Sequence, residues 1–164
     1  MSAESLTRYA DAQRALVGTV ERHALGAVTA GTIGRYARAI GDDNPLYFNP
    51  DAARAAGYAN VIAPPNFLSA VVEWGPGRPE HELAPDGTSR GRSDALRVMG
   101  AGEDIEIVAP VVAGTEVFAE HEILTVEEKQ GRSGPLVFIT ARHDFFAGDG
   151  RALNRNRRTV MVRA

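Results

Sequence analysis

Hydrophobic residues change their spacing near the middle of the chain, from a helical period to strand-like alternation. Between Ile33 and Ile40, apolar side chains recur every three to four residues, which is typical of a helix that packs one face on a core. The run Asn66–Trp74 (NFLSAVVEW) is apolar around most of its circumference and predicts a buried helix. A weaker periodicity over Ser5–Val17 predicts a short N-terminal helix, and an extended piece follows at Val20–Ala27.

The second half of the chain consists of strand-like segments separated by turn residues. Apolar side chains mostly alternate with other residues from Val137 to Phe145, as in a strand with one buried face. Short breaks rich in turn residues, including Gly148-Asp149-Gly150, indicate hairpins and therefore antiparallel neighbours. Helices followed by consecutive long strands predict an α+β fold. The predicted strands are Leu96–Val108, Thr115–Lys129, Gly134–Ala147 and Arg151–Arg163.

Residues with strong turn preferences lie between the predicted helices of the first half. Thr29 is the predicted N-cap of the helix that Gly41 ends. The run Asp42-Asp43-Asn44-Pro45 then turns the chain, because Asp and Asn side chains can bond their own backbone. Asn49-Pro50 predicts an N-cap followed by proline at the first position of a short helix, which Gly57 closes. Polar side chains held between two well-ended helices make a candidate site.

Composition indicates one globular domain that spans residues 1–164. The net charge of −3 argues against general attraction to nucleic acid or membranes. Cysteine is absent, which excludes disulfides and thiolate chemistry, and the histidines lack metal-ligand spacing. A polar N-terminus and the lack of an apolar run of roughly 18 residues predict a cytoplasmic protein. Residues 75–94 are rich in Gly, Pro and charge and are expected to form a long mobile loop.

Tyr36 and the run Gly41-Asp42-Asp43-Asn44-Pro45-Leu46 resemble the hydratase motif of MaoC-like (R)-specific enoyl-CoA hydratases. That motif is an aromatic residue, a few apolar ones and G-D-x-N-P-aliphatic-His, but Tyr47 stands here at the histidine position. The continuation FNPDAARAAGY…VIAPPNFL resembles MaoC-like N-terminal dehydratase domains. The likeness is closest to the non-catalytic subunit of heterodimeric hydroxyacyl dehydratases, which also has tyrosine at this position. The resemblance implies the hotdog fold, in which a curled antiparallel sheet wraps one long central helix.

The resemblance also implies roles for individual residues. Asp42 matches the catalytic aspartate, Asn44 matches the asparagine that organises the turn, and Tyr47 replaces the histidine that transfers protons. An unperturbed tyrosine is only about one part in a thousand deprotonated at neutral pH, so Tyr47 would be a poor base. The family's oxyanion glycine precedes the central helix, where this chain has Ala63-Pro64-Pro65. Pro65 has no N–H to donate, although the amide of Asn66 is one position away.

These departures favour a subunit of an enoyl-thioester hydratase or 3-hydroxyacyl dehydratase that pairs with a chain carrying the intact Asp–His motif. No cofactor is expected, because coenzyme A or an acyl carrier would serve as the handle of the substrate. The expected partners are an acyl thioester and a second hotdog subunit, in a homodimer or a heterodimer, without nucleic acid or membrane. The cavity of this chain would hold the acyl tail, and the residues expected to line it are Pro65, Asn66, Phe67, Leu68, Val71 and Trp74.

Other interpretations remain open. The chain could be a self-sufficient homodimeric hydratase of an unusual acyl-CoA that uses Asp42 with Tyr47, or a non-catalytic module that binds acyl thioesters. Turnover by the chain alone, or binding without turnover when every partner is present, would distinguish them. Asp42 could also be a turn former only, and His121 or His143 could be half-buried strand residues or a surrogate base. A basic cluster on the last strand either guards a sheet edge or contacts phosphate; it comprises Arg151, Arg155, Arg157 and Arg158.

Overall fold

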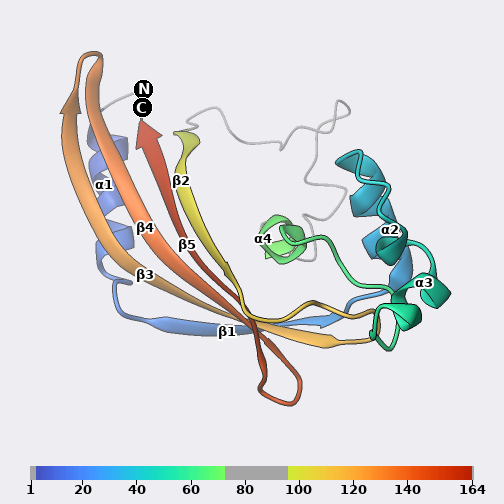
Figure 1. Ribbon diagram of the computed structural model, residues 1–164. Helices are drawn as coiled ribbons and strands as arrows, with labels where there is room; N and C mark the ends of the chain where they lie inside the picture. The colour runs from blue at the N-terminus through green and yellow to red at the C-terminus, as the bar shows by residue number, and fades with distance from the viewer. Residues whose placement is uncertain (1–2, 73–95, 164) are drawn as a thin grey trace, which may run out of the picture.

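The computed structural model describes residues 3–72 and 96–163 and has the predicted order of helices followed by strands (Figure 1). Its helices are α1 (Ala3–Arg14), α2 (Ala30–Ala39), α3 (Pro50–Ala55) and α4 (Phe67–Val72), with a 3-10 turn, η1 (Pro45–Tyr47). Its strands are β1 (Val20–Ala27), β2 (Arg97–Ile107), β3 (Glu116–Gly131), β4 (Gly134–Ala147) and β5 (Ala152–Arg163). The α+β class predicted from the spacing of apolar residues is confirmed.

The strands form one antiparallel sheet in the order β1-β3-β4-β5-β2. Figure 1 shows the sheet curving around α4, with α2 and α3 beyond that helix. Because β5 lies between β4 and β2, it is an interior strand, and the idea that its arginines guard an edge is wrong. The arginines instead face opposite sides: Arg155 and Arg157 alternate with Arg158, which faces the same side as the buried Val162.

Two groups of buried side chains fill the same face of the sheet at its two ends. At one end, Phe67 and Leu68 of α4 pack with Phe145 and with residues of α2. At the other end, Leu6 and Ala10 of α1 cover inward-facing strand residues, which are Ile123, Val137, Ile139 and Val162. Helices α1 and α4 therefore both pack on the concave face of the sheet, where the interior of the fold lies.

Local signals in the sequence account for the ends of the helices. The Thr29 side chain accepts a hydrogen bond from the N–H of Thr32 at 3.1 Å and caps α2, as predicted. Gly41 follows α2 with φ +71°, a left-handed conformation that glycine adopts without strain. Asn49 caps α3 by accepting from the N–H of Asp51 at 2.9 Å, again as predicted. These caps fix where the turn between α2 and α3 begins and ends.

The predicted central helix is described up to Val72. Trp74 and the loop expected at residues 75–94 lie outside the described residues, so the loop remains a prediction. None of the described helices is long and apolar enough to cross a membrane.

Candidate functional site

The turn after α2 is held by the side chains of the hydratase-like motif themselves. Asp42 Oδ1 accepts a hydrogen bond from the N–H of Asn44 at 3.1 Å, and Asn44 Oδ1 accepts from the N–H of Leu46 at 3.1 Å. Asn44 thereby caps the η1 turn, which carries Tyr47. Both side chains stabilise the turn by accepting hydrogen bonds from backbone N–H groups two residues further on, and the turn directs the chain from the end of α2 into the interior.

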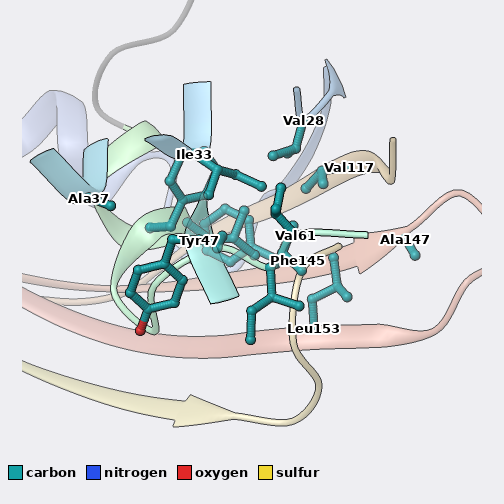
Figure 2. Close-up of a cluster of buried hydrophobic side chains, with 14 of the residues drawn as sticks. Val28, Ile33, Ala37, Tyr47, Val61, Val117, Phe145, Ala147 and Leu153 are labelled. Carbon is teal, nitrogen blue, oxygen red and sulfur yellow. The ribbon is translucent and has the colours of Figure 1, made fainter. Parts of the chain in front are cut away.

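Tyr47 is buried at the edge of the main core, with 7% of its surface exposed. Figure 2 shows its ring beside the core side chains and its hydroxyl pointing away from them. Burial raises the pKa of Tyr47, the negative charge of Asp42 raises it further, and a hydrogen bond with Asn44 partly opposes both effects. The phenol is therefore protonated at neutral pH and is a hydrogen-bond donor rather than a base.

A pocket of about 170 Å³ lies beside Tyr47. Its wall includes Pro65 and Leu68, two of the residues expected to hold the acyl tail, together with Ile107 of β2 and Asn154 of β5. Asn154 is only 2% exposed, and its Nδ2 lies 3.5 Å from the carbonyl oxygen of Pro65. The pocket is thus largely apolar, and the polar side chains in its lining are Tyr47, Tyr58 and Asn154.

Asp42 does not line the pocket beside Tyr47. It borders a separate hollow of about 420 Å³, together with Arg38, Gly41, Asp43 and Phe48. The charge of Asp42 still acts on Tyr47, but neither of the two hollows formed here by the described residues is lined by both side chains. The geometry gives Asp42 a clear part in the turn, whereas its catalytic role remains a prediction.

The other residues expected to line the cavity have different surroundings. Phe67 is 1% exposed and packs edge-on against Tyr36, with ring centroids 5.4 Å apart, so it is a core residue. Asn66 is exposed and is not among the residues that line the pocket beside Tyr47. The side chain of Val71 and all of Trp74 lie outside the described part of the structure.

Sequence reasoning missed Asn154 and Ile107, which enter the pocket from β5 and β2. Asn154 of β5 pairs with Phe145 of β4, so the two side chains lie on the same face of the sheet. A polar residue at an inward-facing strand position was the available signal, but that signal depends on knowing the pairing of the strands. Among the residues that the structure describes, no group of three or more His, Asp or Glu side chains is placed to hold a metal ion.

Comparisons with known proteins agree with this architecture. Residues 15–155 match the family described as FAS1-like, dehydratase domain region. A UPF0336 protein of Parafrankia is 36% identical over 105 residues, which are 64% of this chain and 65% of that protein. The alignment therefore spans slightly less than two thirds of that relative.

Two mycobacterial proteins extend the comparison. The alpha subunit of the 3-oxo-4,17-pregnadiene-20-carboxyl-CoA hydratase of Mycobacterium tuberculosis is 39% identical over 56 residues, 34% of this chain and 18% of that subunit. The truncated HadBC complex of the same organism, a 3R-hydroxyacyl-ACP dehydratase, superposes with a TM-score of 0.68. Its sequence identity is 22%, over 89% of this chain and 96% of that one, so it shows the fold alone. The chain has the predicted hotdog fold and belongs to the family described as FAS1-like, dehydratase domain region.

Proposed function

We propose that this chain is the subunit of an enoyl-thioester hydratase or 3-hydroxyacyl dehydratase that accommodates the acyl chain, while a second hotdog subunit supplies the Asp–His pair. The observation that carries the proposal is Tyr47. It occupies the motif's histidine position, it is buried, and its pKa is raised, whereas a general base at neutral pH needs a pKa near 7. The Asp42 carboxylate borders a different hollow.

Hydration of an enoyl thioester needs a base for water, an acid for the α-carbon and donors for the thioester oxygen. Tyr47 supplies a donor but no base. Pro65 lacks an N–H, so the backbone donor of the family motif is absent at that position. The wall between Leu68 and Ile107 is apolar and suits an acyl group whose thioester is held by coenzyme A or a carrier. Proton transfer then falls to the partner.

The names of similar proteins support this division of labour. HadBC is a dehydratase complex, and the mycobacterial relative is an alpha subunit of a hydratase. Membership of a dehydratase family favours lyase chemistry, and acyl-CoA or acyl-carrier substrates in fatty acid metabolism fit it.

Among the described strands β2 is an edge of the sheet, and this edge offers a surface for the second subunit. Every residue of β2 except Ile105 is exposed, and large apolar side chains lie on and beside this strand: Val98, Met99, Ile107 and Val108. An edge strand with exposed apolar residues is prone to pairing with another chain, because its N–H and C=O groups lack partners on one side. We therefore place the dimer contact, with a second copy or a catalytic subunit, at β2.

Hydration of crotonyl-CoA and of a longer enoyl-CoA tests the proposal directly, through the loss of absorbance by the conjugated thioester. The purified chain is assayed alone, then with a co-purifying subunit that carries the intact motif. Turnover only in the mixture is the expected result. Turnover by the chain alone, abolished in Asp42→Ala, would establish the self-sufficient homodimer instead. Binding of the acyl thioester without turnover, both by the chain alone and by the mixture, would indicate a binding module.

A further inference from the structure

A pair of histidines lies on the buried face of the sheet, outside the pocket beside Tyr47, which we call the Tyr47 pocket. His121 of β3 and His143 of β4 are directly opposite each other, with their Nδ1 atoms 3.2 Å apart and ring centroids 4.6 Å apart. Burial lowers the pKa of both residues, and for His143 the charges of His121 and Arg158 help to lower it to about 4. Both imidazoles are therefore neutral at neutral pH.

Neutrality fixes what the pair can offer to a ligand. One Nδ1 must donate to the other, so one ring has an accepting Nε2 and the other ring has an Nε2–H that donates. Within the described ranges, neither Nε2 atom has a hydrogen-bond partner. The pair thus has one accepting and one donating Nε2, and a hydroxyl group can complement both.

The pair borders a pocket of about 190 Å³ between α1 and the sheet, which we call the histidine pocket. Tyr9 and Gln13 enter it from α1, and Arg158 enters it from β5. The remaining wall is aliphatic: Ile123, Ile139, Ala141 and Val160. This mixture of polar and apolar side chains suits a hydrocarbon group that carries an oxygen.

The histidine pocket and the Tyr47 pocket are neighbours on one face of the sheet. Asn154, in the Tyr47 pocket, pairs with Phe145, so His143 is its diagonal neighbour, about 7–8 Å away. Asn156 lies between the two pockets as the cross-strand partner of His143. It is 2% exposed, and among the described residues its Oδ1 has no hydrogen-bond partner. A single layer of side chains thus separates the pockets, and that layer is polar.

Anchoring of α4 explains only part of this polarity. Ser69 Oγ donates to Glu103 at 2.5 Å, and Arg158 donates to Ser69 at 3.2 Å and to Glu103 at 3.3 Å, which ties α4 to β2 and β5. These contacts give Glu103 and Arg158 a structural purpose. They leave the oxygen of Asn156 and the Nε2 atoms of the histidines unused. A buried polar group without a partner costs about 1–3 kcal/mol. A purely alkyl ligand would leave these polar groups without partners, and apolar residues would bind it better.

We propose that the histidine pocket is a second subsite on the path of the acyl group, and that this chain takes acyl thioesters whose tail carries a hydroxyl or keto oxygen. The proposal rests on the proposed function and adds the class of substrate. The distal oxygen accepts from the Nε2–H of one histidine; a hydroxyl also donates to the other Nε2 or to Asn156. Arg158 lies four steps along β5 from Asn154, about 13 Å at the rise of a strand, which sets the span between thioester and distal oxygen.

The test compares two unreactive esters, decanoyl-CoA and 10-hydroxydecanoyl-CoA, by calorimetry on the complex of this chain with its co-purifying hydratase subunit. The hydroxy ester is expected to bind about three- to tenfold more tightly, the worth of one satisfied hydrogen bond. His143→Phe should remove this preference while decanoyl-CoA still binds. Thr140→Val is the matched control, because Thr140 bonds Thr159 on the opposite face of β4. It should keep the preference.

The outcomes separate the two proposals. Equal binding of both esters by the unmodified complex, or weaker binding of the hydroxy ester, overturns the subsite while the proposed function stands. No binding of either ester overturns the proposed function, and the subsite with it. If His143→Phe does not fold, His121→Phe carries the same expectation. A preference that survives in a folded histidine variant also overturns the subsite.

Discussion

Replacing Asp42 separates a structural carboxylate from a catalytic one. Its Oδ1 accepts from the N–H of Asn44 at 3.1 Å, and an asparagine at position 42 would keep that acceptor while losing the charge. Asp42→Asn is therefore expected to change the free energy of unfolding by less than about 0.5 kcal/mol, since Asp and Asn are equivalent as caps. Asp42→Ala removes the acceptor and should cost about 1 kcal/mol, which lowers Tm by about 2–4 °C.

Denaturant unfolding of both variants and hydration by the mixed complex are the assays. If the proposed division of labour holds, Asp42→Asn leaves turnover by the mixture within about twofold of the unmodified complex, a change of less than about 0.5 kcal/mol in the barrier. The pKa of Tyr47 should also fall, because the charge of Asp42 is one of the causes that raise it. A phenolate titration corrected with Tyr47→Phe measures that change. An Asp42→Asn variant that is as stable as the parent but inactive in the mixture would refute the reasoning.

Three further predictions concern the rest of the molecule. Ser69→Ala removes the hydrogen bond from the buried Ser69 hydroxyl to the exposed Glu103 carboxylate and should lower the free energy of unfolding in urea by about 1 kcal/mol; an unchanged midpoint would contradict the α4 anchor. Because the pKa of His143 is lowered from 6.5 to about 4, the unfolded chain binds more protons below pH 6.5. Stability should fall by up to about 2 kcal/mol from pH 6.5 to 5, and His143→Phe should flatten that slope. Val98→Asp should abolish association in light scattering, whereas Val20→Asp, equally exposed on the other edge strand, should not.

Local rules predicted most of the fold because the features they describe are local. The cap at Thr29, the stop at Gly41 and the cap at Asn49 depend on neighbours within a few residues, and all are as expected. Each strand of the second half lies within a few residues of its predicted bounds, because turn residues mark the ends. The order of strands is not local, which is why β5 was considered an edge strand although β2 covers it.

The candidate site was predictable only as far as the motif reaches. Tyr47, Pro65 and Leu68, three of the residues that the sequence singled out, line one pocket, and their role in binding substrate remains a prediction. Ile107 and Asn154, which pair with each other across β2 and β5, complete that pocket from the second half of the chain. Asp42 and Tyr47 belong to one motif, but Asp42 precedes the η1 turn and Tyr47 ends it, and their side chains line different hollows. Sequence proximity fixed the turn and not the direction of its side chains.

The inward-facing polar residues are where local pattern and global fold disagree most. On β4, apolar alternation runs through Val137, Ile139 and Ala141, is interrupted at His143, and resumes at Phe145. On β5, the inward-facing positions are polar from Asn154 through Asn156, the partner of His143, to Arg158, so both strands break the rule in the same part of the sheet. One break alone is ordinary, but paired breaks in a buried layer oppose burial energetics twice at one place. A ligand oxygen between His143 and Asn156 would supply a hydrogen-bond partner to both residues, and this is why we assign the distal oxygen of the substrate to that position.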